Sequence, residues 1–172
     1  RLSSAAGVAL VRKAGQQGAK VSCDVAVHHL HLSEVDIGYF DSHARFDPPL
    51  RSGADRAALR EAVSEGLAAV CSDHSPVDED GKQLPFAEAV PGATGLELLL
   101  PLTLKWAAED GVPVATALGK ITSAPAMLLG SRATLDAGAP ADLCLFDASE
   151  WWRVERRALH SQGKHTPFLG IE

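Results

Sequence analysis

The chain has 172 residues, of which 46% are hydrophobic and 22% charged, and its formal net charge is −6. A chain of this length and composition can bury one sizeable core, so we expect an ordinary globular fold. The negative charge argues against a nucleic-acid partner, because such proteins gather Lys and Arg on one face. Apolar runs such as residues 96–104 are shorter than the ~18 residues of a membrane span, so we expect no membrane partner either.

The first half of the chain alternates predicted helices and strands. Ser3 or Ser4 is expected to cap a helix whose apolar residues keep helical spacing up to Gly15 and Gly18. The apolar, β-branched run 21–27 predicts a strand that is buried on both faces. After a long loop at 33–52, the amphipathic pattern of 55–65 predicts a second helix, and residues 67–71 predict a second strand.

The second half begins with another long loop and is then mainly helical. The loop covers residues 74–93, and Thr94 is expected to cap an apolar helix over 95–109. Shorter helices are predicted at 113–120 and 123–129. From residue 133 onward, Thr134-Leu135, the alternation at 142–146 and Trp151–Val154 predict short strands joined by turns. Alternating strands and helices imply a parallel sheet with functional residues on the loops after its strands.

The three cysteines, Cys23, Cys71 and Cys144, are odd in number and show no paired spacing. We therefore expect neither a disulfide framework nor a zinc knuckle. Each is predicted to be a reduced, buried thiol in a cytoplasmic protein. Because the sequence starts at Arg1 without Met or a targeting segment, we expect it to be cut out of something longer.

The segment Ser72-Asp73-His74-Ser75-Pro76 places a carboxylate directly after a predicted strand. An aspartate in that position can bind a metal or transfer a proton. Taken alone, the motif is weak evidence, because a turn-capping aspartate is the commoner explanation.

Four motifs in order carry a resemblance to a known family: residues 21–30, 47–51, 72–76 and 138–143. Together they resemble the dihydroorotases, cyclic amidohydrolases of pyrimidine biosynthesis, over nearly the whole chain and about the last third of that family's length. The resemblance implies an α/β fold: the C-terminal part of a metal-bearing (β/α)8 TIM-type barrel, followed by short strands of a small β-sandwich domain. Residues 1–132 would hold barrel strands seven and eight with their helices, and residues 133–172 part of the β domain.

The resemblance also implies site residues. Asp73 matches the carboxylate that touches the metal and shuttles the proton. Arg1 stands where the family has a metal-binding His on strand six, and a guanidinium cannot ligate zinc. The family's substrate contacts correspond to four positions that mostly carry other residues: Asp47, Val77, Pro91 and Gly92.

Two functions follow from these substitutions. The first is an inactive dihydroorotase-like protein with no cofactor, similar to the bacterial pseudo-dihydroorotases that support assembly of aspartate transcarbamoylase. Its expected partners are the transcarbamoylase catalytic chain and the missing N-terminal part of its own barrel, in an oligomer. The alternative is an active zinc dihydroorotase, which the retention of Asp73 favours.

The remaining histidines and tryptophans are predicted to be structural. The cluster at 28–31 is expected to pack and to hydrogen-bond within loops, and His74 is expected to orient its own loop. Trp151 and Trp152 are expected to lie in the core rather than on a partner surface. The other histidines show no ligand spacing: His43, His160 and His165.

Overall fold

The chain is built around a short parallel sheet, seen in a computed structural model that describes residues 1–131 and 134–172. Strand β1 (Asp24–Ala26) pairs in parallel with β2 (Ala69–Cys71), and Val25 lies opposite Val70. Leu2 forms a further parallel bridge to Val25 from the other edge of β1. Three segments that are distant in sequence are therefore side by side, which brings Arg1, Asp24 and the residues after β2 to one region.

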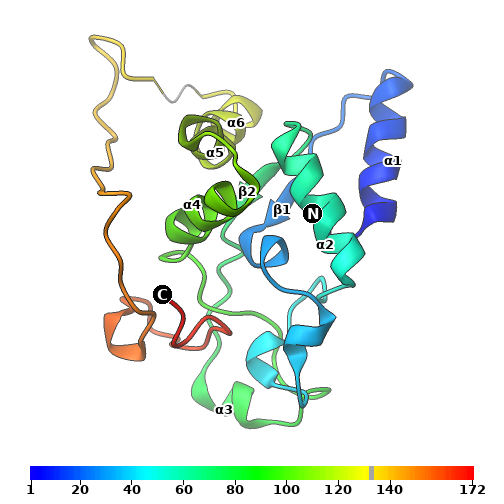
Figure 1. Cartoon of the computed structure of the whole chain (residues 1–172), viewed down its shortest axis with the longest axis vertical. Coiled ribbons are helices and arrows are strands. Elements are labelled where there is room, and N and C mark those ends of the chain that lie inside the picture. The colour runs from blue at the N-terminus through cyan, green and yellow to red at the C-terminus, as the bar shows by residue number, and fades with distance from the viewer. Residues whose placement is uncertain (132–133) are drawn as a thin grey trace.

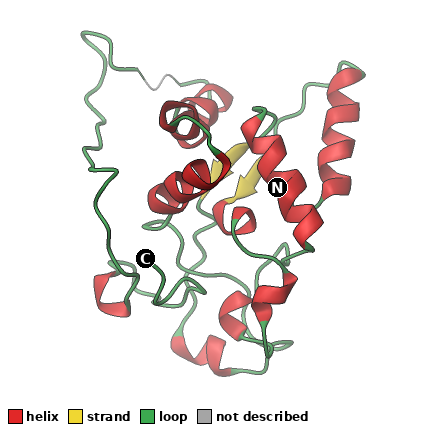
Figure 2. Ribbon diagram, in the orientation of Figure 1, coloured by secondary structure: helices red, strands yellow, loops and turns green. Residues whose placement is uncertain are grey.

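Helices cover the strands on opposite sides (Figures 1 and 2). On one side lie α1 (Ala5–Gln16) and α2 (Gly53–Ser64). On the other side lie α4 (Leu99–Asp110), α5 (Val114–Ile121) and α6 (Ser123–Leu128). The short α3 (Glu79–Gln83) lies with the loops at the lower end of Figure 1. Side chains from both helical layers and from the strands share one apolar core, with Leu59, Val70 and Trp106 among its members.

The helices of the first half form where capping and apolar spacing predict them. Ser4 caps α1 and accepts a hydrogen bond from the backbone N–H of Gly7 at 3.2 Å. Helix α2 begins two residues earlier than predicted, because Ser52 and Asp55 form a capping box. Strand β1 is shorter than the predicted 21–27, because the chain turns into a 3-10 helix at Val27–Leu30.

The start of α4 corrects one prediction. Thr94 does not cap this helix, because its hydroxyl donates to the carbonyl of Gly163 at 2.5 Å and its backbone N–H donates to the carbonyl of His165. Residues 96–98 form a turn, and the helix begins at Leu99. Helix α3 lies inside the loop predicted at 74–93 and was not foreseen, whereas α5 and α6 agree with the sequence pattern.

The strands predicted after residue 133 are wrong for the part that the structure describes, because residues 134–172 contain no strand. Figure 1 shows the segment after α6 running apart from the helices, and residues 141–150 are all exposed. An alternating pattern forms a strand only when a neighbour supplies hydrogen bonds, and no other described segment forms backbone hydrogen bonds with residues 141–149. Cys144 is consequently exposed rather than buried, and Trp151 is 81% exposed.

The chain end returns to the helical part. Val154, Leu159 and Phe168 join the same core as α4, and Trp152 packs against it while half-buried. The domain boundary predicted between residues 132 and 133 falls outside the described residues, so it stays a prediction. Within 1–131 and 134–172, every helix is too short or too polar to cross a membrane.

Candidate functional site

An arginine joins a carboxylate at the start of β1 to a carboxylate that follows β2. Arg1 makes a two-point contact with Asp24, with its Nε 3.1 Å from Oδ1 and its Nη2 3.3 Å from Oδ2. Its Nη1 donates to Oδ1 of Asp73, two residues beyond β2. A guanidinium offers only donors, in a planar fork that suits two carboxylates at once. The three segments of the sheet are thus tied together by one cation.

The charges of this cluster perturb their neighbours. Hydrogen bonding to Asp24 raises the pKa of Arg1, against an opposing effect of burial. Burial alone would raise the pKa of Asp24, but the hydrogen bonds and charge of Arg1 outweigh it and lower the pKa. The neighbouring thiol of Cys71 has its pKa raised to about 11, mainly by burial and next by the charge of Asp24. At neutral pH the cluster holds an arginine cation, an Asp24 anion and a neutral thiol.

The backbone around Asp73 is held in an unusual conformation. Asp73 has φ +48°, in the left-handed region that non-glycine residues seldom occupy. The next residue fixes this turn, because Nδ1 of His74 accepts hydrogen bonds at 3.2 Å from the backbone N–H groups of Gly95 and Leu96. The prediction that His74 orients the loop is confirmed. Strained backbone of this kind persists only when its surroundings determine it.

His28 is a buried neighbour of Asp73. Its Nε2 is 3.8 Å from Oδ2 of Asp73 and has no hydrogen-bond partner, while its ring stacks on Phe46 with centroids 3.8 Å apart. Burial lowers the pKa of His28 well below its usual range, so the ring is neutral and the contact is not an ion pair. His29 and His31 contact the backbone carbonyls of Pro49 and Leu102. These contacts confirm the packing interpretation of the 28–31 cluster.

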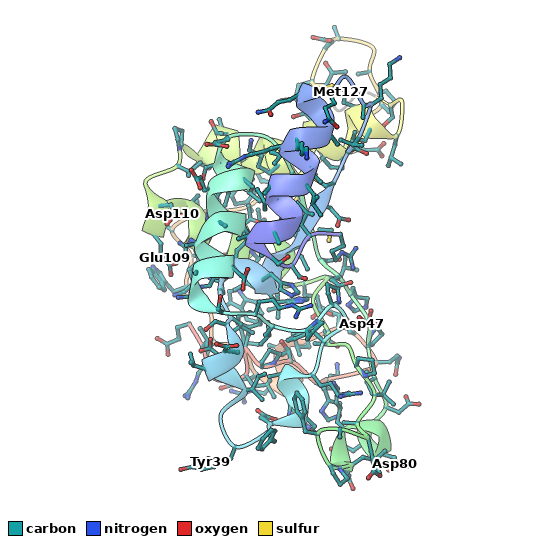
Figure 3. All side chains as sticks on the ribbon, turned by 90° about the vertical axis from the view of Figure 1, so that its right-hand side faces the viewer. Tyr39, Asp47, Asp80, Glu109, Asp110 and Met127 are labelled. Carbon is teal, nitrogen blue, oxygen red and sulfur yellow. The ribbon has the colours of Figure 1, made fainter. Side chains whose placement is uncertain are left out.

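The four predicted substrate positions do not all gather at this site. Gly92 lies against the Asp73 loop, where an added Cβ would be 2.6 Å from the carbonyl oxygen of Ser75. Val77 is buried in packing against Gly81 and Gly163. Asp47 and Pro91 are exposed, and Figure 3 shows Asp47 apart from Tyr39 and Asp80 at the lower end of the molecule. Their roles in binding remain predictions.

A small cavity lies beside the cluster. It is lined by His28, Phe46 and Ser72, together with residues of the chain end, but not by Arg1, Asp24 or Asp73, and its volume is only about 10 Å³. That is close to the least volume that admits one water molecule.

The donor set does not fit a metal ion. Among residues 1–131 and 134–172, no three His, Cys, Asp or Glu side chains are grouped as metal ligands would be. Asp73 already faces Arg1, a cation that would repel a metal and that has no lone pair to offer it. The side chains that this chain supplies therefore stabilise an arginine where the resemblance implies a metal.

A second cluster lies in the loops, and sequence reasoning missed it. His43 and His165 face each other, with Nε2 of the first 2.9 Å from Nδ1 of the second. The outer nitrogens of the two rings contact Asp41 at 2.8 Å and Glu79 at 3.1 Å. The two histidines are 122 residues apart, so no local spacing could have indicated the pair.

The fold is similar to part of several solved cyclic amidohydrolase structures. It matches the L-hydantoinase (dihydropyrimidinase) from Arthrobacter aurescens with a TM-score of 0.90 and 28% identity, over 99% of this chain and 40% of that one. A dihydroorotase from Saccharomyces cerevisiae, in complex with 5-fluoroorotic acid, matches with a TM-score of 0.69 and 16% identity, over 77% and 37% of the two chains. That second match concerns the fold alone. No protein-family model matches the chain.

Homologues over this length are dihydroorotases and dihydroorotase-like proteins. The dihydroorotase of Geotalea daltonii is 36% identical over 171 residues, which cover 98% of this chain and 40% of the relative. The dihydroorotase-like protein of Pseudomonas aeruginosa is 40% identical over 178 residues, which cover 99% and 40%. The chain thus spans about two-fifths of the length of these relatives. The resemblance read from the four sequence motifs is confirmed at the level of homology and fold.

Proposed function

We propose that this chain is part of a catalytically inactive dihydroorotase-like protein of the cytoplasm, which serves as a structural partner for the catalytic chain of aspartate transcarbamoylase. In this proposal residues 1–132 supply the C-terminal part of the barrel, and residues 133–172, which hold no strand among the described residues, form part of a small β domain only together with strands from the rest of the protein. Asp73 marks the ancestry of the site without performing its chemistry.

The observation that carries the proposal is the position of Arg1. Its guanidinium binds both Asp24, at the start of β1, and Asp73, after β2, where a hydrolase of this class needs an open metal and a free carboxylate. The oxygen of Asp73 that faces Arg1 is already occupied by a hydrogen bond from the guanidinium, so it is not free to contact a metal or a substrate. Hydrolysis of a cyclic amide needs a proton to move to the leaving nitrogen.

The chain end supports a structural role. Leu143, Leu145 and Trp151 are largely exposed on a segment that has no strand neighbour within the described residues. Exposed alternating residues of this kind are suited to pairing with further strands. In the proposal, these strands belong to the N-terminal part of the same barrel protein, and the completed assembly contacts the transcarbamoylase.

The alternative is an active zinc dihydroorotase whose other ligands lie on segments outside this chain. The relatives named dihydroorotase favour it, as does the retention of Asp73 in a fixed loop. Zinc would then supply the activated hydroxide, and Arg1 would have to leave Asp73.

Metal content and turnover separate the two functions. The protein that carries this chain in its natural full length would be purified, its zinc measured, and hydrolysis of dihydroorotate assayed alongside the Arg1→His variant. The scaffold predicts less than stoichiometric zinc and no turnover in either form. Stoichiometric zinc with turnover in the unaltered protein would refute it. Turnover restored by Arg1→His alone would show that the substitutions at Asp47 and Val77 do not prevent activity.

The partner is tested separately. Aspartate transcarbamoylase catalytic chain would be mixed with the full-length protein and followed by size-exclusion chromatography with light scattering. A stoichiometric complex is expected, and two separate peaks at micromolar concentrations would contradict the assembly role.

A further inference from the structure

The second cluster joins four segments that are far apart in the sequence. His43 lies in a short 3-10 helix (Ser42–Ala44), Glu79 opens α3, Arg156 opens another 3-10 turn (Arg156–Ala158), and His165 lies in the chain end. The side chain of His165 is 3% exposed and that of His43 is 30% exposed. The contacts between them therefore lie partly away from water, where hydrogen bonds matter most.

The protons in this cluster can be counted from its geometry. An ionised carboxylate only accepts hydrogen bonds, so Nδ1 of His43 must donate to Asp41 and Nε2 of His165 must donate to Glu79. If both rings were neutral, Nε2 of His43 and Nδ1 of His165 would then be two lone pairs 2.9 Å apart. One proton more is needed between them.

Arg156 indicates on which ring that proton lies. Its Nη2 is 3.5 Å from Nδ1 of His165, and a guanidinium can only donate. Nδ1 of His165 is therefore an acceptor, and the extra proton belongs to Nε2 of His43. The lower exposure of His165 agrees, since burial disfavours the charged ring and lowers its pKa, partly offset by Glu79.

We propose that His43 and His165 share one proton, carried as a His43 imidazolium, and that this proton clamps the chain end onto the loop around residue 43. The clamp is closed only while one shared proton lies between Nε2 of His43 and Nδ1 of His165. When that proton is lost, two lone pairs face each other unless one ring abandons Asp41 or Glu79. When a second proton is gained, two N–H groups face each other.

The charged groups around the pair are balanced for this state. Asp41 contacts the His43 imidazolium and Glu79 contacts the neutral ring of His165, and Arg156 lies 3.3 Å from Glu79 as well as beside His165. Lys82 faces the same loop and donates from Nζ to the carbonyl of Ser42 at 2.9 Å, with its pKa lowered to about 8, chiefly by burial. Lys82 also tends to lose its charge in alkaline solution. A Lys82 variant is therefore needed to distinguish its deprotonation from that of the histidine pair.

The clamp has a local reporter outside the cluster. The backbone N–H of Thr94 donates to the carbonyl of His165 at 2.8 Å, so its hydrogen exchange reports whether the chain end is docked. We expect the protection factor of this amide, corrected for the intrinsic rate, to be highest near neutral pH. It should fall roughly tenfold toward each end of the range from about pH 5 to about pH 9, as one hydrogen bond from a charged donor is lost.

Substitutions distinguish the effect of the shared proton on Thr94 protection from the effect of side-chain packing. In His43→Gln the amide N–H₂ lies near the position of Nε2 and donates without titrating, so protection of Thr94 should persist in alkaline solution. Lys82→Met should keep the alkaline fall, and so should the control His160→Gln, which alters a neighbouring exposed ring. An alkaline fall that survives in His43→Gln, or disappears in Lys82→Met, would overturn the proposal.

Nitrogen-15 spectra of the histidine rings in the unaltered protein test the same point independently of any variant. We expect both nitrogens of His43 to be protonated near neutral pH, and Nδ1 of His165 to be bare. Two neutral rings near neutral pH, with Thr94 fully protected, would refute the shared proton. This experiment remains decisive if His43→Gln does not fold.

Discussion

Removing the Arg1 guanidinium should destabilise the protein in a pH-dependent way. In Arg1→Ala, Asp24 and Asp73 lose the cation that they share. The side chains of Arg1, Asp24 and Asp73 are 31%, 35% and 14% exposed, which places the cluster between a surface pair and a buried one.

The exposure sets the expected magnitude. Exposed ion pairs contribute ~0.2–1 kcal/mol, whereas breaking a buried pair costs ~3–5 kcal/mol. After allowance for solvent screening, we expect Arg1→Ala to lower the free energy of unfolding by about 1–2 kcal/mol at pH 7. For a protein of this size, the melting temperature should fall by about 2–8 °C.

The pH dependence identifies the cause. The pKa of Asp24 is lowered in the folded state, so its stabilising effect is present above the unfolded pKa of ~3.9 and is lost as the pH falls through the folded value. The difference between Arg1→Ala and the unaltered protein should therefore vanish in strong acid. Urea unfolding measured across this range tests it, with Arg12→Ala as the control, since that arginine forms an exposed pair with Glu65. Equal losses in the two variants at neutral pH, or a loss from Arg1→Ala that persists in acid, would refute the reasoning.

Three further substitutions or reactions test the packing around the site. Gly92→Ala should cost about 2–3 kcal/mol in urea unfolding, because the residue has φ +125° and a Cβ would press on Ser75, whereas Gly38→Ala at an open position should cost only about 1 kcal/mol. Leu59→Ala, in the core, should cost ~2–5 kcal/mol, against less than ~0.5 kcal/mol for Leu10→Ala on the exposed face of α1; similar losses would contradict the assigned core. Cys71 should react with a thiol reagent near pH 8 much more slowly than the exposed Cys144, because burial raises its pKa to about 11; mass spectrometry of the modified peptides distinguishes them, and equal rates would show that Cys71 is accessible.

Local signals in the sequence were sufficient for α1 and α2. Ser4 begins α1, and the Ser52–Asp55 box begins α2, because a cap is a contact between residues three positions apart. Thr94 shows the limit of this reasoning. Its hydroxyl had the right place for a cap, but the carbonyl of Gly163, 69 residues later, took the hydrogen bond. A local pattern cannot reveal such a competitor.

The candidate site was likewise predictable in part: local motifs located its residues but not the contacts between them. The motif at residues 72–76 located Asp73, and the matching of four motifs located Arg1, but neither indicated that the two side chains meet. That contact follows from the parallel bridges of Leu2 and β2 to opposite edges of β1. The predicted strand at 142–146 failed for the complementary reason: its alternation is real, but a strand needs a neighbour, and the described residues supply none.

Both polar clusters compensate their charges from within the chain. Arg1 lies between Asp24 and Asp73, and the histidine pair with Arg156 lies between Asp41 and Glu79. A catalytic metal site works in the opposite way, since its acidic side chains stay uncompensated until the ion or the substrate arrives. Charges that are neutralised within the chain stabilise its folded state. They leave little electrostatic field to attract a dication or to orient an anionic substrate. In the proposed function, the arginine that occupies Asp73 also ties the three sheet segments together, so that a loss of activity and a gain of structural stability would follow from one contact.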